Sequence, residues 1–507
     1  MKISELLFFG EYTAEQDVAD LFVTRPISDP EALHEGCLFI CLRGLRFDTH
    51  TLLKRVEAGG AAAVIVEKSV TVPDDVKLPI LRVSSTRAAL ALVYSRFHGS
   101  PEKELTMIGV TGTNGKTSTA TVLYTILRAA GICAGLIGTA ECRYRDTVYT
   151  LPEEEREKSA RLRTMTTPDP DILFPILKTM KDAGVTHVVM EVSSHALALD
   201  KVLPITFAVG IFTNLSPEHL DFHTDMTSYL AAKAKLFCQC RVGIFNCDSE
   251  YAERIIEKAS CKICRCGIAW QGERHATEIT LLGSGGVQYR YIAPGMRLKI
   301  RTSLPGTFSV YNTMLALTAA IELGVSPPTA AEALGGPLYV PGRMERIAIG
   351  HEPFSVFIDY AHTEAALRTL LQTVRAFKSA DQAIVLLFGC GGNRDKSKRA
   401  PMGAVAEELS DRVIVTSDNC RNEKAEDIIG DILAGMRHPE RARVIKDRKR
   451  AIEEAILTAA PGDILLLVGK GHETYDITEN GIRHFDERKI IAAALEKKKK
   501  GDTTDEN

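Results

Sequence analysis

Short apolar runs alternate along the chain with segments in which apolar residues recur every three to four positions. Near the N-terminus, Cys37–Leu42 and Ala61–Val66 have the pattern of buried strands, and Thr51–Ala58 between them has helical spacing. The same pattern predicts further buried strands at Leu105–Val110, His187–Val192, Ile205–Thr213, Val242–Phe245, Val356–Asp359, Ala383–Phe388, Val413–Thr416 and Asp463–Val468. Strands that alternate with helices in this way indicate α/β architecture with parallel sheets.

Polar, turn-forming segments divide this pattern into three parts. The first break is Gly99–Glu104, and a second change of character falls around Pro337–Pro341. We therefore expect a small α/β domain over residues 1–102, a central P-loop-type domain with a parallel sheet over 103–338, and a Rossmann-like domain over 339–507. The lysine-rich tail Lys497–Asn507 has low complexity, and we expect it to be disordered.

Composition excludes several classes of function. The 507 residues carry 62 Lys and Arg against 65 Asp and Glu, a net charge of −3, so no basic field indicates a nucleic-acid partner. No apolar run approaches membrane-spanning length, and no signal peptide is recognisable, so we expect a cytoplasmic protein without membrane contact. The 12 cysteines are scattered, as in a reduced compartment. Cys261, Cys264 and Cys266 lack the second half of a zinc motif, which favours structural thiols over a zinc site.

A glycine-rich loop follows the strand at Leu105–Val110 and opens a helical stretch at Ser118–Ala130. Backbone N–H groups of such a loop can approach phosphate oxygens, and the start of the helix adds a partial positive charge. Lys116 can reach the terminal phosphates, and the Thr117 hydroxyl can bind Mg²⁺. The sequence therefore predicts a nucleoside triphosphate site formed by Gly112, Thr113, Asn114, Gly115, Lys116, Thr117 and Ser118.

Polar residues follow two later strands. Glu191 and Ser193 end one of them, where ligands of open α/β sheets bind, and Glu191 is a candidate oxygen ligand for a second Mg²⁺. The segment from Asn214 to His223 is rich in His and acidic residues, which suits metal contacts but also a capped polar loop. From these residues alone, a structural role for either cluster stays open.

Together these motifs resemble the Mur ligases, the ATP-dependent amide-bond formers of peptidoglycan synthesis, and among them the members that add the third peptide residue. The matching segments occur in the expected order and cover most of the chain: 112–117, 166–169, 191–195, 214–221, 232–233, 311–312, 341–346, 359–363, 389–395 and 469–473. The resemblance implies an ATP-dependent acid–amino-acid ligase, in which a substrate carboxylate takes the γ-phosphate of ATP to form an acyl phosphate. An incoming amine then displaces the phosphate.

The resemblance also implies roles for individual residues. Lys116, Glu191, His219 and Lys233 match catalytic positions. Thr117 with Glu191 would hold one Mg²⁺, and His219 with Lys233 would serve a second, Lys233 being carbamylated to N6-carboxylysine so that it does not repel the metal. The remaining matches are contacts to the nucleotide (Asn312, Arg343, Asp359, His362) and to the UDP-muramoyl-dipeptide acceptor (Pro30, Thr166, Thr167, Ser193, Lys201). A nucleotide contacted from two domains implies domain closure before chemistry.

Two loops match the amino-acid site. Asp418-Asn419-Cys420-Arg421 stands where relatives that add diaminopimelate have Asp-Asn-Pro-Arg, and Arg394, Gly469 and Glu473 match the other contacts. Because meso-diaminopimelate differs from lysine by a second carboxylate, which a guanidinium can hold bidentately, Arg421 favours diaminopimelate. Lysine or another amino acid remains the alternative.

The sequence departs from the family pattern mainly at positions that match contacts to the acceptor. Asp29-Pro30-Glu31 replaces the usual Asp-Ser-Arg, and Lys201 replaces an arginine. A divergent relative with another acceptor is therefore a second hypothesis, and a catalytically silent ATP-binding scaffold is a third. The joint presence of Lys116, Glu191, His219 and Lys233 argues against the scaffold. We expect a monomer.

Overall fold

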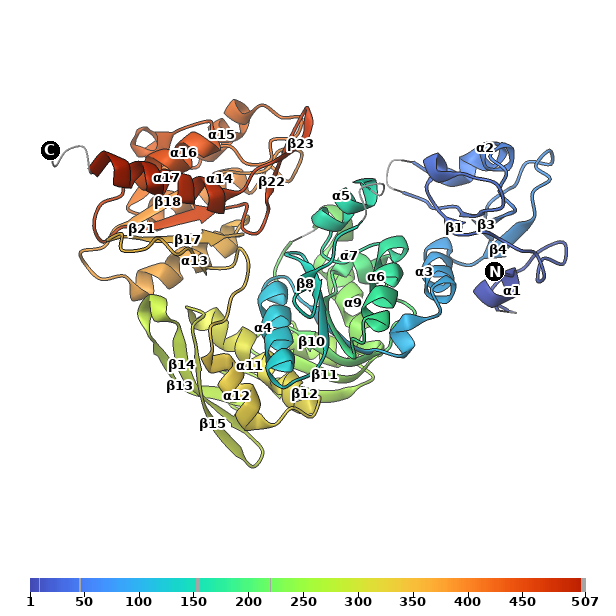
Figure 1. Cartoon of the computed structure of the whole chain (residues 1–507), viewed down its shortest axis with the longest axis horizontal. Coiled ribbons are helices and arrows are strands. Elements are labelled where there is room, and N and C mark those ends of the chain that lie inside the picture. Colours follow the sequence, from blue (N-terminus) through green and yellow to red (C-terminus); the bar gives the residue numbers. More distant parts are fainter. Residues whose placement is uncertain (9, 45–46, 152–155, 219, 503–507) are drawn as a thin grey trace. The chain divides into compact units, whose positions relative to one another are not determined.

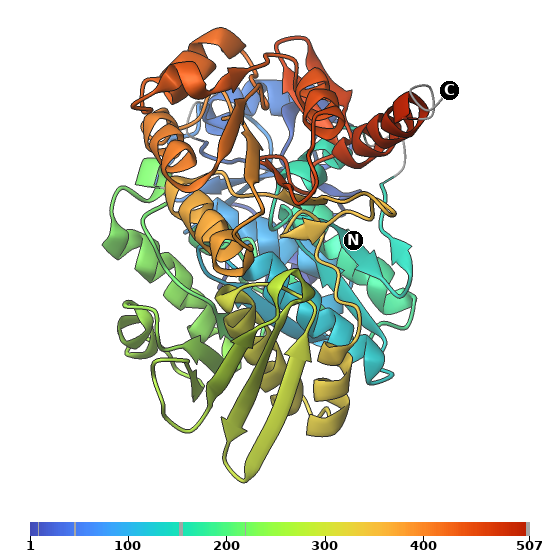
Figure 2. The same cartoon turned by 90° about the vertical axis from the view of Figure 1, so that its left-hand side faces the viewer.

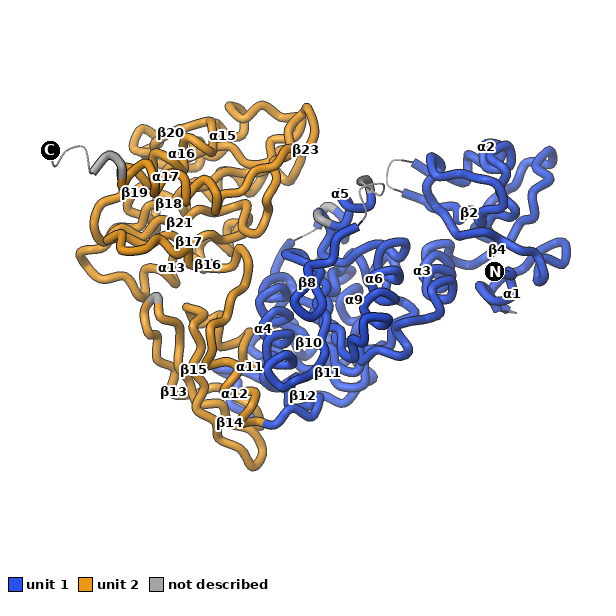
Figure 3. Tube along the Cα trace, in the orientation of Figure 1, with its two compact units in different colours: residues 1–272, 315–326 blue, residues 273–314, 327–507 orange. Residues whose placement is uncertain are grey.

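The computed structural model describes the chain except for residues 9, 45–46, 152–155, 219 and 503–507 (Figure 1). By its internal contacts the chain divides into two compact units, residues 1–272 with 315–326 and residues 273–314 with 327–507 (Figure 3). Each unit contains at least one mainly parallel sheet covered by helices, which confirms the expected α/β class. No helix among the described residues is both long enough and apolar enough to cross a membrane.

The first unit begins with a small sheet of four parallel strands in the order β1-β2-β3-β4. Its elements are α1 (Ile3–Leu6), β1 (Pro26–Ile27), β2 (Leu38–Ile40), α2 (Leu53–Ala58), β3 (Ala63–Glu67), β4 (Ile80–Val83) and α3 (Thr86–Phe97). The strands predicted at Cys37–Leu42 and Ala61–Val66 are confirmed, with shifted ends. The helix predicted at Thr51–Ala58 starts as a 3₁₀ turn at Thr49–Leu52, because Asp48 caps that turn by accepting from the His50 N–H.

The second sheet of this unit has eight strands in the order β12-β11-β10-β5-β9-β6-β7-β8. Its elements are β5 (Thr106–Thr111), α4 (Lys116–Ala129), β6 (Ala134–Ile137), β7 (Cys142–Tyr144), β8 (Thr147–Val148), α5 (Arg156–Thr164), α6 (Pro170–Asp182), β9 (His187–Glu191), α7 (Ser194–Ala198), β10 (Phe207–Phe212), α8 (Leu220–His223), α9 (Met226–Cys238), β11 (Cys240–Asn246), α10 (Ala252–Ile256) and β12 (Lys262–Cys266).

The register of this sheet positions the candidate site. β5 lies between β9 and β10, with Val110 opposite Glu191 and Thr111 opposite Phe212. The carboxyl ends of the three parallel strands therefore meet at one edge, and the glycine loop, Glu191 and Asn214 follow directly from them. The antiparallel strands β7 and β8 extend the sheet beyond β6 and were not predicted.

The second unit contains a three-stranded antiparallel sheet, formed by β13 (His275–Leu281), β14 (Val287–Ala293) and β15 (Met296–Thr302), whose neighbouring strands are visible in Figure 2. No apolar run in the sequence predicts this sheet. β14 nevertheless alternates buried residues (Val287, Tyr289, Tyr291) with more exposed ones, which is the pattern of a strand with one covered face. The helix α11 (Thr307–Glu322) follows, with its residues from Leu315 onward assigned to the first unit, and α12 (Pro327–Gly335) comes next.

The same unit ends with a six-stranded sheet in the order β16-β17-β21-β18-β19-β20, parallel except for β16. Its elements, with the neighbouring hairpin β22–β23, are β16 (Glu345–Arg346), β17 (Ser355–Asp359), α13 (Glu364–Phe377), β18 (Ile384–Phe388), α14 (Arg399–Leu409), β19 (Arg412–Val415), α15 (Ala425–Leu433), β20 (Arg443–Val444), α16 (Arg448–Leu457), β21 (Ile464–Val468), β22 (Tyr475–Thr478), β23 (Gly481–His484) and α17 (Glu487–Asp502). One core joins the sheet to α13–α15 and another joins it to α16 and α17, so helices cover both faces.

The expected disorder of the lysine-rich tail is wrong for residues 497–502, because α17 continues to Asp502. Lysine is a good helix former, and Lys498 Nζ donates to the backbone carbonyls of Ile456 and Ala459, at 3.3 and 3.1 Å. Lys497 pairs with Glu453 on α16. Both contacts tie the end of α17 to the end of α16. The last five residues of the tail lie outside the described part of the chain.

Candidate functional site

The glycine loop leads from β5 into α4 with a conformation that requires its glycines. Gly115 precedes α4 with φ of +84°. A Cβ on Gly112 would lie 1.8 Å from Thr213 Oγ1, so only glycine fits between β5 and the end of β10. Lys116 Nζ donates to the carbonyl oxygens of Gly112 and Thr113, at 3.0 and 2.8 Å. The loop thus places an ammonium beside backbone N–H groups at the start of a helix, which is the arrangement of a phosphate site.

The carboxylate of Glu191 lies next to this loop and is only 1% exposed. Its Oε2 accepts from Thr117 Oγ1 at 3.0 Å and from Thr139 Oγ1 at 3.1 Å. Its Oε1 accepts from the Thr139 backbone N–H at 2.8 Å. The structure therefore brings together Thr117 and Glu191, the two oxygen ligands that the family resemblance assigns to one Mg²⁺.

Lys233 is buried in α9, with 1% of its surface exposed. Its Nζ lies 4.7 Å from the centre of the Tyr229 ring, and Tyr229 OH is 3.1 Å from Thr113 Oγ1 in the glycine loop. Burial lowers the pKa of Lys233 well below its usual value, and the positive charge of Lys116 adds to this effect. Among the described side chains no carboxylate forms an ion pair with Lys233 Nζ. Lys235, the neighbouring lysine, instead pairs with Asp200 at 2.9 Å.

The loop after β10 supports the glycine loop. The Asn214 side-chain oxygen accepts from the Asn114 N–H at 2.9 Å, and the Asn214 amide donates back to the Asn114 carbonyl at 3.1 Å. His219, the other predicted metal ligand, lies outside the described residues. Further along, the His223 ring is buried and its Nε2 lies 2.8 Å from Ser194 Oγ.

Three of the predicted acceptor residues lie around the end of β9. Thr167 Oγ1 donates to the Glu191 carbonyl and accepts from the Ser193 N–H, both at 2.9 Å. Thr166 Oγ1 is 3.0 Å from Thr139 Oγ1. The three hydroxyl residues therefore lie beside the candidate metal ligand.

The other two acceptor residues are placed differently. Lys201 pairs with Asp169 at 2.7 Å. Pro30 begins a 3₁₀ turn capped by Asp29, whose Oδ1 accepts from the Glu31 N–H at 3.0 Å. Burial lowers the pKa of Arg161, but three nearby carboxylates raise it above its usual value: Asp171, Asp169 and Asp29. Asp29 thus acts on the same arginine as Asp169, the ion-pair partner of Lys201.

In the second unit, three of the predicted nucleotide contacts gather near Tyr360. The Arg343 guanidinium lies 4.6 Å from the centre of the Tyr360 ring, and His362 Nδ1 is 3.0 Å from the Tyr360 carbonyl. The Asp359 carboxylate is partly buried and accepts from the N–H groups of Met344 and Ala361. Burial raises the pKa of Asp359, which the charge of Arg343 partly offsets. Asn312 lies in α11 and is buried.

The predicted amino-acid residues also come together, at the carboxyl ends of β18, β19 and β21. Arg421 Nη1 donates to the carbonyls of Gly392 and Asn419, at 3.0 and 3.2 Å. A Cβ on Gly391 would lie 3.1 Å from Arg421 Nη1 and 3.9 Å from Arg394 Cγ, so the two arginines flank this glycine. Neither arginine forms an ion pair with a carboxylate among the described residues. Burial and the charge of Arg394 lower the pKa of Arg421, and the charges of Asp418 and Glu473 offset this only in part.

A buried network holds the rest of this site. Asn419 Nδ2 donates to Glu473 Oε2 at 2.7 Å, and Lys470 Nζ donates to Asn419 Oδ1 at 3.1 Å. Burial raises the pKa of Asp418, but the charges of Lys470 and Arg448 outweigh it and leave that pKa below its usual value. Burial and the charge of Asp418 raise the pKa of Glu473. Gly469 allows close approach, because a Cβ there would lie 2.5 Å from Asp418 Oδ2.

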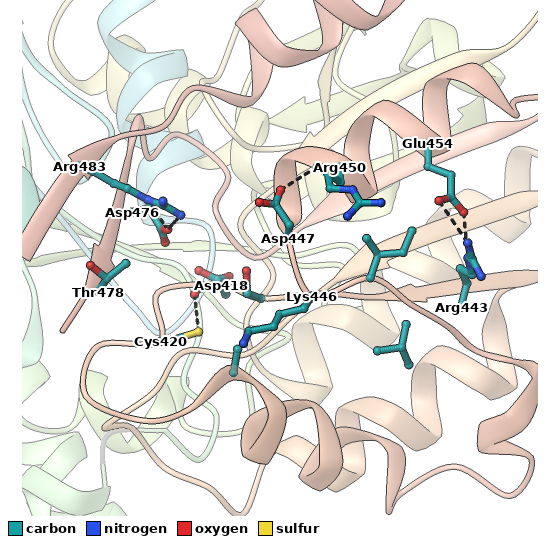
Figure 4. Close-up of a pocket in the computed structure, with 14 residues that line it drawn as sticks. Asp418, Cys420, Arg443, Lys446, Asp447, Arg450, Glu454, Asp476, Thr478 and Arg483 are labelled. Atoms are coloured by element: carbon teal, nitrogen blue, oxygen red, sulfur yellow. Dashed lines mark hydrogen bonds and ion pairs between the residues drawn. The ribbon is translucent and has the colours of Figure 1, made fainter. Parts of the chain in front are cut away.

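A cavity of about 650 Å³ borders the Asp418–Cys420 loop at the carboxyl ends of β19 and β20 (Figure 4). It shares Asp418 and Cys420 with the candidate amino-acid site but is not lined by Arg394, Arg421 or Glu473. Two ion pairs, Arg443 with Glu454 and Arg483 with Asp476, occupy its walls. Within each pair the charges offset each other, and the remaining charged residues of the lining have both signs: Asp418, Lys446, Asp447 and Arg450.

Sequence reasoning missed three residues that organise these sites. Thr139 holds both oxygens of Glu191, Tyr229 links Lys233 to the glycine loop, and Lys470 orients Asn419. Two of them could have been found: Lys470 lies within the 469–473 motif, and Tyr229 precedes Lys233 by one helical turn, so both share one face of α9. Nothing in the sequence singles out Thr139.

The donor set around Glu191 suits a hard cation. A buried carboxylate and a hydroxyl 3.0 Å apart are oxygen ligands of the kind that Mg²⁺ takes beside phosphate. Lys233 does not fit a metal as an ammonium, but it fits as an anionic carbamate, and its lowered pKa favours the neutral amine that reacts with CO₂. Among the described residues, no group of three or more His, Cys, Asp or Glu side chains could hold a metal by itself.

Comparisons with known proteins agree with these observations. Residues 110–320 match the family model of the Mur ligase middle domain, and residues 342–471 match that of the Mur ligase glutamate ligase domain. The chain is 40% identical, over 94% of its length and 92% of the relative's, to the UDP-N-acetylmuramoyl-L-alanyl-D-glutamate–2,6-diaminopimelate ligase of Chlorobium phaeobacteroides. It is 36% identical to the ligase of the same name from Syntrophomonas wolfei, over 99% of this chain and all of the relative.

Solved structures give the same result. The structure of a UDP-N-acetylmuramoyl-L-alanyl-D-glutamate–2,6-diaminopimelate ligase superposes with a TM-score of 0.67 at 25% identity, over 98% of this chain and 99% of the other. Folylpolyglutamate synthase of Mycobacterium tuberculosis, complexed with ADP and AMPPCP, superposes with a TM-score of 0.60 at 20% identity, over 76% of this chain and 92% of the other. At that identity the second likeness concerns the fold alone.

Proposed function

The chain belongs to the Mur ligase family, and from this premise we propose that it joins meso-2,6-diaminopimelate to UDP-N-acetylmuramoyl-L-alanyl-D-glutamate with consumption of ATP. The proposal is supported by its likeness to ligases of that name over nearly the whole chain. The observation that carries the choice of amino acid is Arg421, a half-buried guanidinium that has no carboxylate partner among the described residues.

The chemistry requires two anions to meet. A carboxylate of the acceptor attacks the γ-phosphate of ATP, ADP leaves, and the acyl phosphate then reacts with the amine of diaminopimelate to release phosphate. We propose that the glycine loop and Lys116 bind the phosphates and offset their charge. Asn312, Arg343, Asp359 and His362 are the further proposed contacts to the nucleotide.

We propose Mg²⁺ as the cofactor, held by Thr117 and Glu191 at one position and served by His219 and Lys233 at the other. When bound, Mg²⁺ neutralises charge on the two reacting anions. Lys233 would act as a carbamate: its neutral Nζ adds to CO₂, a C–N bond forms and one proton is released. Two features of Lys233 support this step, because its burial and the positive charge of Lys116 each lower the pKa of the amine.

Pro30, Thr166, Thr167, Ser193 and Lys201 are the proposed contacts to the acceptor. Arg394, Asp418, Asn419, Cys420, Arg421, Gly469 and Glu473 are those to diaminopimelate. Within the second set, the two arginines suit a carboxylate, and Glu473 suits an ammonium group. We also propose that the chain acts as a monomer in the cytoplasm, where its 12 free thiols would stay reduced.

Product analysis tests the proposal. Purified protein is incubated with ATP, Mg²⁺, the UDP-muramoyl-dipeptide and either diaminopimelate or lysine, and phosphate and the product mass are measured. We expect a tripeptide product with diaminopimelate and one phosphate released per product. A product with lysine alone would refute the amino-acid choice, and no product with either would refute the acceptor.

A further inference from the structure

Thr139 lies between two groups with different proposed tasks. Its hydroxyl is 3.1 Å from Glu191 Oε2, a proposed metal ligand, and 3.0 Å from Thr166 Oγ1, a proposed acceptor contact. Its backbone N–H separately donates to Glu191 Oε1 at 2.8 Å. Thr139 follows β6, the neighbour of β9 in the sheet, so its position is set by the sheet.

The hydroxyl of Thr139 has one hydrogen and two acceptors within reach. It can donate to Glu191 or to Thr166, but not to both at once. A carboxylate without a cation is the stronger acceptor, because charge-assisted hydrogen bonds are about twice as strong as neutral ones. A cation held by the Glu191 carboxylate would compete for its lone pairs, and the hydrogen of Thr139 would then favour Thr166.

The second arrangement changes what Thr166 presents to a ligand. When Thr166 Oγ1 accepts from Thr139, its own hydrogen is held in a polarised chain and can be donated to the acceptor substrate. When Thr139 donates to Glu191 instead, this support is lost. Whether the Glu191 carboxylate holds a cation thereby affects how well Thr166 can donate a hydrogen bond to the acceptor substrate, and the Thr139 side chain connects the two.

We propose that Thr139 is a positioning residue that couples cation binding at Glu191 to binding of the acceptor at Thr166. The inference rests on the proposed function, because it takes Glu191 as a metal ligand and Thr166 as an acceptor contact. Thermodynamic linkage makes the coupling reciprocal: the acceptor must strengthen cation binding by the same factor by which the cation strengthens acceptor binding.

The experiment measures this factor on the full chain. Calorimetry gives the Kd of the UDP-muramoyl-dipeptide in the presence of a non-hydrolysable ATP analogue, with and without Mg²⁺. The reciprocal measurement is the Kd of Mn²⁺, followed by electron paramagnetic resonance, with and without the dipeptide. In the wild-type chain we expect each ratio to be about three- to tenfold, the range of one net hydrogen bond.

Three variants separate coupling from structure. Thr139→Val removes the hydroxyl but keeps the side-chain shape and the backbone bond to Glu191, and we expect both ratios to fall below about twofold. Thr139→Ser keeps the hydroxyl and should restore them. Thr125→Val is the matched control, because Thr125 Oγ1 also donates a single bond, to the Thr121 carbonyl at 2.9 Å, and it should leave the ratios unchanged.

The outcomes are distinct from those for the proposed function. A wild-type chain that makes no tripeptide contradicts the proposed function. A chain that makes the tripeptide but shows no coupling overturns the role of Thr139 alone. Coupling that survives in Thr139→Val, or that is lost in Thr139→Ser, overturns it as well.

Discussion

Replacing Arg421 by methionine tests how the proposed amino-acid site chooses its substrate. The substitution keeps a long apolar side chain but removes the guanidinium, whose Nη1 donates to the carbonyls of Gly392 and Asn419. Arg421 has a φ of +52°, and methionine keeps that left-handed conformation, so backbone strain is the same in both chains. Arg421→Lys is the control that keeps the charge but loses the planar fork.

The magnitude follows from the missing carboxylate partner. A bidentate, charge-assisted contact to the distal carboxylate of diaminopimelate is worth about 1.5–3 kcal/mol, so its loss lowers kcat/KM by about 10- to 150-fold. Lysine has no distal carboxylate, so its kcat/KM should change by less than about threefold. Arg421→Lys should fall between the wild type and Arg421→Met for diaminopimelate.

Steady-state phosphate release with each amino acid measures these ratios, and thermal unfolding of each variant shows whether the loop remains folded. Equal losses for diaminopimelate and lysine would mean that Arg421 supports the fold rather than selecting the substrate. An unchanged kcat/KM for diaminopimelate would refute the assignment of Arg421.

Three further predictions concern other parts of the molecule. Lys233→Ala should lower turnover by at least about 100-fold, because the charge of the carbamate is lost. The control Lys235→Ala removes only the ion pair with Asp200 and should change turnover little. Phosphate release measures both variants, and equal activities would contradict the role of Lys233. Gly112→Ala should abolish binding of a fluorescent ATP analogue, because the new Cβ would lie 1.8 Å from Thr213 Oγ1. Gly131→Ala should retain binding, because a Cβ at that position would meet no other part of the chain within 4 Å. The ion pair with Arg399 lowers the pKa of Glu423 to about 2. The stabilisation from this ion pair should therefore be complete above the ordinary glutamate pKa and disappear as the pH falls through about 2. The Tm difference between wild type and Glu423→Gln should therefore shrink over that acidic range, and a difference that is independent of pH would refute the ion pair as its source.

Much of the fold could be predicted because buried parallel strands carry a local signal. Strands such as His187–Glu191 and Ile384–Phe388 are buried on both faces, so they appear as continuous apolar runs. The hairpin strands β7 and β8 lack this signal, because they have only three and two residues, and those of β8 are exposed. The tail was misjudged for a related reason: its helix depends on contacts between Lys498 and α16, which composition does not reveal.

Some residues of the candidate sites could likewise be predicted from the sequence, and others could not. Lys116, Glu191 and Arg421 stand out because their residue types occur in recognisable motifs. Thr139 and Tyr229 act through geometry, as partners of a motif residue, and a lone threonine or tyrosine carries no local signal. Charge environment is also invisible in the sequence, as the buried Lys233 shows, since a helical lysine is ordinarily exposed.

The most direct test of the proposed reaction follows one oxygen atom. The UDP-muramoyl-dipeptide is labelled with ¹⁸O in its reacting carboxylate and turned over with ATP, Mg²⁺ and diaminopimelate, and the released phosphate is analysed by mass spectrometry. An acyl phosphate requires that a carboxylate oxygen leave with the phosphate, so the account predicts one ¹⁸O atom per phosphate from fully labelled acceptor. Phosphate that carries no ¹⁸O while the tripeptide forms would contradict it.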